Sequence, residues 1–273
     1  MNNYILIVFD SCRYDSFLSA EPRALRRMGT VERRFSYASW TAPSHFNLLM
    51  GLMPHRSLQH VIASDSYKDE FIRYNLRLGV DNLDFKAMLP TLYLPLFLKE
   101  RLGYATHAMV SLPVLNPKTA INRGFDTYTL MPNHNDMRAM LRQMRFSEER
   151  PSFYLLNVGE THYPYALPDE DPGNTPTIHG VHGVVKHMGD SSVDGKREFP
   201  SAGSLREMQD RQISAVRYLD GVIEELVDIV PKNTFITVTA DHGELFGEDG
   251  YFGHGPIMHP KVFEVPFVEA RIR

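Results

Sequence analysis

The chain has 273 residues, of which 43% are hydrophobic and 23% charged, and its 29 Lys and Arg against 33 Asp and Glu give a formal net charge of −4. A chain of this length can bury a sizeable core, and no linker divides residues 1–273, so a single domain is predicted. The weak net charge gives no basic field and argues against nucleic acid as a partner. A single cysteine, Cys12, excludes an internal disulfide and a multi-thiolate metal site, so a metal would need oxygen and imidazole ligands.

The N-terminal stretch MNNYILIVFD holds a short apolar run with no basic leader, which is typical of a buried strand and not of a signal peptide. The longest apolar stretch, residues 87–98, is interrupted by Pro90 and Pro95 and is too short to span a bilayer. We therefore expect a cytoplasmic protein without a membrane span, in which residues 87–98 form a core helix or a lid. The sequence leaves the oligomeric state open.

Short apolar segments rich in β-branched residues alternate with helix-like segments along the chain. Strands are predicted at residues 4–9, 105–110, 153–158, 234–239 and 265–268. Helices are predicted at residues 44–50, 85–101, 136–145 and 205–230. This alternation predicts an α/β fold, a doubly wound and mostly parallel sheet with helices on both faces.

Two further features concern the last of these helices and the segment before it. The helix has apolar residues at helical spacing, and Ser204 with Glu207 predicts a capping box at its start. Residues 167–203 are rich in Pro, Gly, Asp and Ser and show no sustained periodicity. We predict that they form a substrate lid or a flexible loop.

Three of the predicted strands are followed by acidic residues and histidines. The first strand ends at Asp10, the third is followed by Glu160 and His162, and the fourth by Asp241 and His242. In an open parallel sheet, ligands bind outside the carboxyl ends of the strands. Because carboxylates near buried strand ends need compensating charge, their convergence predicts a cationic substrate or, more simply, a divalent metal. Taken alone, Asp10 could equally be a helix N-cap.

The segment SWTAPSHFNLLMGLMPHR, residues 39–56, places Thr41 just before a helix predicted to start at Pro43. In that position its hydroxyl lies in the positive field of the helix N-terminus, which also attracts a tetrahedral anion. A threonine hydroxyl is a poor nucleophile at neutral pH, and metal coordination is one way to lower its pKa. The alternative is that Thr41 is only the N-cap of this helix.

These motifs, in this order along nearly the whole chain, resemble the sulfatase-like branch of the alkaline phosphatase superfamily. Residues 10–15, DSCRYD, are similar to its first motif, and residues 41–56 to its nucleophile motif and the segment that follows. The landmarks Gly-Tyr-x-Thr and Gly-Phe-Asp-x-Tyr are matched at 103–106 and 124–128. The runs Thr-Ala-Asp-His-Gly-Glu at 239–244 and Gly-His-Gly at 253–255 complete the order. The resemblance implies the fold of that superfamily.

The resemblance also implies roles for these side chains. It implies one divalent cation, Mn, Zn, Mg or Ca, with the ligands Asp10, Thr41, Asp241 and His242. The metal would ionise the Thr41 hydroxyl, which would then attack the substrate in line. His162 and His254 fall where the family has ligands of the substrate oxyanion or the leaving-group acid. The remaining candidates for substrate binding are Arg13, His45, Glu160 and His259.

A second metal is less favoured than a single one. Glu160 and His162 have the wrong spacing for the Asp-x-x-x-His pair of the two-metal relatives, although they could bind an ion together with His254 and His259. The resemblance stops near Arg273, where the family continues into a smaller C-terminal subdomain, so a truncated member is implied.

Two departures from the family pattern bear on the substrate. Sulfatases oxidise a cysteine or serine at the nucleophile position to formylglycine, an aldehyde that Thr41 cannot form. His45 stands where sulfatases have arginine, which removes a fixed cation beside the nucleophile. Phosphate monoesters, phosphate diesters or phosphonates are therefore expected as substrates in preference to sulfate esters.

The leading hypothesis is a metal-dependent hydrolase or transferase that acts on a small-molecule phosphate-like ester through Thr41. One alternative is a sulfate-ester hydrolase. Another is an enzyme of the same fold recruited to a non-hydrolytic tailoring step on a small metabolite. A metal-stabilised binding module without activity is a further alternative, which retention of the metal ligands disfavours.

Overall fold

The computed structural model describes residues 2–51, 93–168, 170, 185–186, 199–255 and 257–273. Its centre is a seven-stranded sheet with the strand order β2-β10-β7-β1-β5-β3-β4. The strands are β1 (Tyr4–Phe9), β2 (Glu32–Phe35), β3 (Ala105–Val110), β4 (Thr127–Leu130), β5 (Ser152–Val158), β7 (Phe235–Ala240) and β10 (Glu264–Arg271). The run from β7 to β4 is parallel, whereas β10 lies antiparallel to both β7 and β2. The predicted doubly wound, mostly parallel sheet is thus confirmed.

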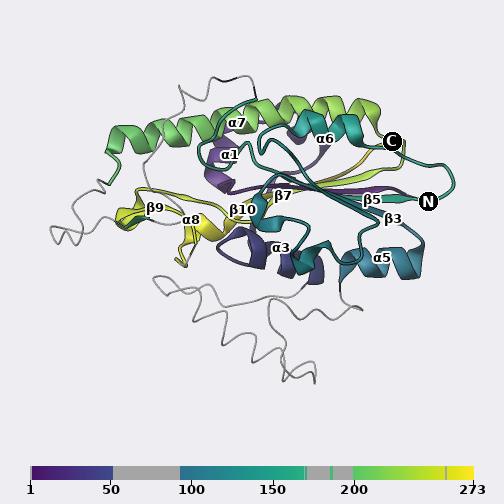
Figure 1. The fold of residues 1–273 in the computed structure, drawn as a ribbon. Helices are drawn as coiled ribbons and strands as arrows, with labels where there is room; N and C mark the ends of the chain where they lie inside the picture. Colours follow the sequence, from purple (N-terminus) through teal and green to yellow (C-terminus); the bar gives the residue numbers. More distant parts are fainter. Residues whose placement is uncertain (1, 52–92, 169, 171–184, 187–198, 256) are drawn as a thin grey trace.

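Helices cover both faces of the sheet (Figure 1). One face carries α1 (Tyr14–Ala20), α2 (Arg23–Met28), α6 (Met137–Gln143) and α7 (Ala202–Ile229). The other carries α3 (Thr41–Met50) and α5 (Leu94–Leu102). The remaining elements are the short helices η1 (Pro113–Leu115), η2 (Ala120–Asn122), η4 (Glu248–Gly250) and α8 (Pro260–Phe263), and a small sheet of β6 (Val185–Lys186), β9 (Tyr251–Gly253) and β8 (Leu245–Phe246).

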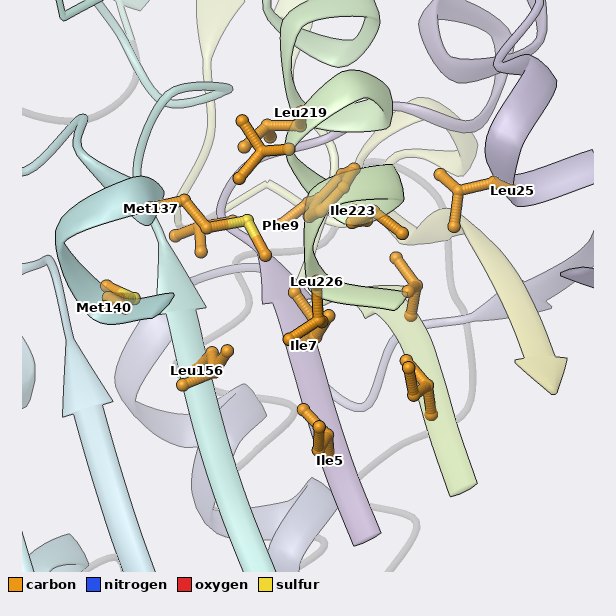
Figure 2. Close-up of a cluster of buried hydrophobic side chains, with 14 of the residues drawn as sticks. Ile5, Ile7, Phe9, Leu25, Met137, Met140, Leu156, Leu219, Ile223 and Leu226 are labelled. Carbon is orange, nitrogen blue, oxygen red and sulfur yellow. The ribbon is translucent and has the colours of Figure 1, made fainter. Parts of the chain in front are cut away.

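The central strand β1 is apolar throughout because it is buried on both faces. Ile5, Ile7 and Phe9 belong to the core on the side of α7, and Figure 2 shows Phe9 beside Ile223 and Ile7 beside Leu226 of that helix. The residues between them, Leu6 and Val8, belong to the core on the side of α3 and α5. Fully burying each such side chain contributes about 1.5–3 kcal/mol. Packing in these two cores fixes where β1 ends in the sheet, and therefore the position of Asp10, the residue that follows it.

The ends of several predicted elements differ from the observed ones. The helix α7 begins at Ala202 with Ser201 as N-cap, whose hydroxyl accepts a hydrogen bond from Ser204 N at 3.1 Å, so the predicted capping box of Ser204 and Glu207 is wrong. Within the predicted helix 85–101, residues from Leu94 onward are helical and residues 85–92 lie outside the described part. Most of the predicted lid at 167–203 also lies outside it.

Among the residues that the structure describes, no helix combines the length and the apolar character needed to cross a membrane. The expected cytoplasmic location and the single domain stay predictions.

Candidate active site

The predicted acidic residues and histidines meet because three parallel strands end side by side. Phe9, the last residue of β1, pairs with Val158 at the end of β5 and with Ala240 at the end of β7. Asp10 and Asp241 directly follow these strand ends, so they leave the sheet at the same height. This is the edge at which open α/β sheets bind their ligands.

Thr41 reaches the same edge from helix α3. It is the first helical residue, and Trp40 in extended conformation (φ −153°, ψ 166°) is the N-cap. The alternative that Thr41 is an N-cap is therefore wrong. The hydroxyls of Ser36 and Ser44 both donate to the carbonyl oxygen of Asp241, which ties the first turn of α3 to the end of β7. The helix ends at Met50, before Gly51 in left-handed conformation (φ 68°).

The structure brings the four predicted metal ligands together in a buried cluster. The Thr41 Oγ1 atom lies 3.5 Å from Asp10 Oδ1 and 3.3 Å from His242 Nε2. His242 Nε2 lies 3.4 Å from Asp241 Oδ2 and 4.0 Å from Asp10 Oδ1. Asp10, Asp241 and His242 each offer one ligand atom, and these atoms all lie within 4.8 Å of one another. We call these four residues the Asp-His cluster.

The chemistry of the Asp-His cluster fits a divalent cation. Burial, and then the charge of Asp10, raise the pKa of Asp241 well above its usual value, and among the described residues its Oδ2 atom has no hydrogen-bond partner. His242 Nδ1 donates to the carbonyl oxygen of Gly243 at 2.9 Å, which leaves the Nε2 lone pair facing the carboxylates. Burial lowers the pKa of His242 well below its usual value, so the imidazole is neutral as a ligand must be. Two carboxylates and an imidazole suit Zn²⁺ or Mn²⁺.

Asn157, on β5, is a residue of the site that the sequence analysis missed. Its Nδ2 atom donates to Asp10 Oδ2 at 2.9 Å. Burial would raise the pKa of Asp10, but His162, His242 and this amide outweigh it and lower the pKa. Asn157 therefore holds one oxygen of the carboxylate and leaves the other facing the cluster. Asn157 is a polar residue near the end of an otherwise mostly apolar buried strand, and this feature of the sequence could have indicated a role in the site.

Thr41 opens onto a cleft of about 630 Å³ that His162 and His254 also line. The ring centroid of His254 lies 4.3 Å from that of His242 and 5.5 Å from that of His162. The structure thus brings both predicted catalytic histidines to the cluster. Their roles stay predictions.

The position of His254 is set by a second residue that the sequence analysis left without a role. Glu244 is buried, and its Oε1 atom accepts from His254 Nδ1 at 3.0 Å, while its Oε2 atom accepts from the Tyr165 hydroxyl. Burial would lower the pKa of His254, but the Glu244 carboxylate outweighs it and raises the pKa. With Nδ1 bound, Nε2 is the ring nitrogen left for a substrate. Glu244 follows the Asp-His-Gly run directly, which could have drawn attention to it.

The predicted substrate-binding residues Arg13 and His45 have different surroundings. The Arg13 guanidinium is 2% exposed and forms ion pairs with Asp15 at 2.6 Å and Glu248 at 2.7 Å, contacts that oppose a role in substrate binding. His45 is buried beneath the cluster, where Nδ1 donates to the Thr41 carbonyl oxygen at 2.9 Å. Its predicted substrate contact stays a prediction.

Glu160 and His259 are held in other contacts. Glu160 Oε1 accepts from the backbone N–H of Met137 at 2.8 Å, at the start of α6. His259 Nδ1 accepts from the Lys261 N–H at 3.1 Å. Among the described residues, Glu160, His162, His254 and His259 do not form a second group close enough to share a metal.

Comparison with known proteins extends over almost the whole chain. The family model described as Sulfatase matches residues 2–270. The phosphonate monoester hydrolase of Agrobacterium radiobacter is 18% identical with a TM-score of 0.60, over 98% of this chain and 68% of that one. The periplasmic domain of phosphoethanolamine transferase EptC from Campylobacter jejuni is 13% identical with a TM-score of 0.58, over 98% of this chain and 78% of that one.

A third similar structure contains a metal. It is the periplasmic domain of EptC from Escherichia coli in complex with Zn, 14% identical with a TM-score of 0.56, over 100% of this chain and 73% of that one. No curated protein matches the chain. At these identities the structural likeness shows the fold alone. The family model, in contrast, matches a range of the sequence that includes every residue of the Asp-His cluster. The chain belongs to the sulfatase family.

Proposed function

We propose that the chain is a metal-dependent hydrolase or transferase of phosphorus esters with Thr41 as its nucleophile. The observation that carries this proposal is the position of the Thr41 hydroxyl. It lies 3.5 Å from a carboxylate oxygen of Asp10 and 3.3 Å from His242 Nε2, and it also lines an open cleft. A hydroxyl that faces both a metal-ligand cluster and a cleft can be activated on one side and meet a substrate on the other.

The Asp-His cluster would hold the cation through Asp10, Asp241 and His242. When bound, a divalent cation supplies positive charge that lowers the pKa of the Thr41 hydroxyl and offsets the charge of a phosphoryl oxygen. The cluster is preorganised by the chain itself, because Asn157 holds Asp10 and the Gly243 carbonyl oxygen holds His242. Such fixed outer contacts keep the ligand atoms aligned before any substrate arrives.

The residues around the cleft support a two-step reaction. In the first step the Thr41 hydroxyl gives up its proton to solvent, Oγ1 forms a bond to phosphorus, and the bond from phosphorus to the leaving oxygen breaks. A proton from His254 Nε2 passes to that leaving oxygen. In the second step the oxygen of water, or of an acceptor alcohol in a transferase, bonds to phosphorus and gives its proton to the now neutral His254 Nε2. The bond from phosphorus to Oγ1 breaks and releases Thr41. The carboxylate of Glu244 keeps His254 oriented through both steps. His162 lines the same cleft and is placed to bind a phosphoryl oxygen.

The choice of phosphorus over sulfur rests on Thr41 and on the relatives. A threonine cannot become the formylglycine aldehyde that sulfate-ester hydrolysis uses in this family. The names of the similar proteins from A. radiobacter and C. jejuni describe a phosphonate monoester hydrolase and a phosphoethanolamine transferase. Both act on phosphorus, so phosphate esters and phosphonates are the substrates to test first.

The test is turnover of p-nitrophenyl phosphate, bis-p-nitrophenyl phosphate and p-nitrophenyl phenylphosphonate by protein stripped of metal and reloaded with Mn²⁺, Zn²⁺, Mg²⁺ or Ca²⁺. We expect turnover that requires a metal and falls at least about a hundredfold in Thr41→Ala. Thr41→Ser, which keeps a hydroxyl, should retain part of it. The matched control is Thr234→Ala, a buried threonine that precedes β7, far from the cluster. Equal turnover by Thr41→Ala and wild type would contradict the proposal.

A further inference from the structure

The cleft beside Thr41 continues into a second hollow. The second hollow has a volume of about 550 Å³ and shares Leu112, Pro113, His162 and Tyr163 with the first. It extends along the end of β4 to Met131. The two hollows therefore form one groove that starts at the nucleophile and runs between η1 and the segment after β5. We call it the η1 groove.

The wall of the η1 groove next to Thr41 is largely apolar. Trp40, Leu112, Val114 and Phe252 contribute to it, and Val114 is 48% exposed although it is aliphatic. Among the described residues, neither hollow has a lysine or arginine in its wall. The carboxylate of Glu244 is bound on both oxygens, by His254 and Tyr165. Apart from the imidazoles of His134, His162 and His254, a charged group in this groove would meet apolar side chains and lose its hydration without gaining a lysine or arginine as partner.

We propose that the η1 groove binds the leaving group of the ester and selects an uncharged, apolar alcohol or phenol. This inference rests on the proposed function, since it requires Thr41 to attack a phosphorus ester. His254 lines the same cleft as Thr41, so the leaving oxygen lies at the entrance to the groove when it takes the proton from His254 Nε2. The rest of the leaving group then extends along Leu112 and Val114. Volumes of this size suit a group of one or two rings.

The groove excludes other leaving groups by the same reasoning. A nucleotide or a sugar phosphate would bring further anionic or polar groups against apolar side chains, where the described wall offers no lysine or arginine. An aryl or alkyl group would instead remove its own surface and that of the half-exposed Val114 from water.

Three matched probes test this: phenyl phosphate, 2-naphthyl phosphate and 6-sulfonato-2-naphthyl phosphate, whose leaving oxygens have similar acidity. We expect kcat/KM for 2-naphthyl phosphate to exceed that for phenyl phosphate by about tenfold, because the second ring is buried in the groove. The sulfonate on that ring should reverse the gain. Both changes are expected mainly in KM, since the reacting atoms are the same.

A charge at the entrance should change this preference. Val114→Lys should raise kcat/KM for the sulfonated probe and lower it for 2-naphthyl phosphate, each by severalfold. The control is Ile229→Lys, which places the same charge on another exposed aliphatic residue (51% exposed) at the end of α7. We expect it to leave the ratio of the two probes unchanged. Thermal melts of both variants check that they fold.

The outcomes separate this inference from the proposed function. Turnover of all three probes at equal kcat/KM, with no effect of Val114→Lys, would overturn the inference and leave the proposed function standing. If no probe is turned over, calorimetry with the metal-loaded wild type decides. Tighter binding of 2-naphthyl phosphate than of its sulfonated form, reversed by Val114→Lys, would support the groove even though the proposed function had failed. Equal or absent binding would overturn the groove as well.

Discussion

Two groups of charged side chains lie close together in sequence but are built in opposite ways. Asp15 accepts hydrogen bonds from Arg13 and Lys261, which outweigh burial and lower its pKa to about 2. In the Asp-His cluster, Asp241 lies beside a second carboxylate and the neutral imidazole of His242, and its pKa is raised well above the usual value. The first group is neutralised by the chain's own cations. For the second, the proposed metal would supply the positive charge, and this difference would distinguish a structural ion pair from a metal centre.

The largest expected effect comes from Asp241→Asn. Removing one of the two carboxylates should lower metal affinity and metal-dependent turnover at least about a hundredfold. In metal-free protein the same change should raise the melting temperature, because the repulsion from Asp10 is removed. Metal content by mass spectrometry, turnover, and thermal melts in chelator measure the three effects.

The control for this variant is Asp228→Asn, an exposed residue of α7. It should alter none of the three quantities. Metal-free Asp241→Asn that melts well below metal-free wild type would mean that Asp241 is a structural residue like Asp15.

Arg13→Met should have the opposite pattern. It leaves the carboxylates of Asp15 and Glu248 without their buried partner, so the free energy of unfolding should fall by about 3–5 kcal/mol. Metal affinity should stay near that of wild type. Lys261→Met removes a half-exposed cation from the same group and should cost no more than about 1 kcal/mol. Urea unfolding of both variants, with a metal titration of each, gives the comparison. Loss of turnover in Arg13→Met at unchanged stability and metal affinity would instead indicate the substrate contact that the sequence analysis predicted for Arg13.

Glu160 provides a buried carboxylate of a third kind, which accepts hydrogen bonds from backbone N–H groups and has no ion-pair partner among the described residues. Burial raises its pKa from 4.5 to about 7. Folding therefore favours the protonated acid, so its stabilising contribution is fully present below pH 4.5 and is lost as the pH rises through 7. Glu160→Gln should remove this loss, which corresponds to about 3 kcal/mol.

Urea unfolding of wild type and Glu160→Gln from pH 4 to pH 8 measures the effect. The free energies of unfolding of the two proteins should be close at pH 4 and differ most at pH 8, where Glu160→Gln should be the more stable. The exposed control Glu207→Gln should follow wild type throughout. Parallel curves for wild type and Glu160→Gln would contradict the account.

Glu244→Gln should have the smallest effect that turnover can resolve. A glutamine keeps an acceptor for His254 Nδ1 but removes the charge that favours the protonated ring. We expect phenyl phosphate, whose leaving oxygen needs a proton, to be slowed by about ten- to a hundredfold, and p-nitrophenyl phosphate by much less. Equal slowing of both substrates would indicate that Glu244 supports only the structure of the site.

Parts of this arrangement follow directly from the sequence pattern. The strands β1 and β3 have the predicted boundaries. For β1 the reason is that a strand buried on both faces is a continuous apolar run. The convergence of Asp10 and Asp241 follows from parallel strands that end at one edge. In contrast, β2 has the sequence ERRF and is exposed throughout, so no apolar alternation marks it. It is a strand because β10 lies beside it.

The parts of the site that could not be predicted depend on side-chain contacts between distant segments. Nothing local indicates that Arg13 pairs with Glu248, 235 positions away, or that Asn157 holds Asp10. The ion pairs of the Arg13 guanidinium with two carboxylates come from the fold, and the substrate contact that the motif predicted for Arg13 stays a prediction. The start of α7 differs for a similar reason, since Ser201 and Ser204 are both good caps and the packing of Leu205 selects the earlier one.

The central claim is that Asp10, Thr41, Asp241 and His242 surround one cation, and anomalous diffraction from crystals loaded with Zn²⁺ or Mn²⁺ tests it most directly. The account predicts one strong peak about 2.0–2.2 Å from an oxygen of each aspartate and from His242 Nε2, with the Thr41 oxygen beside it. A peak elsewhere in metal-replete protein, or a cluster without a peak and with its carboxylates turned apart, would contradict it.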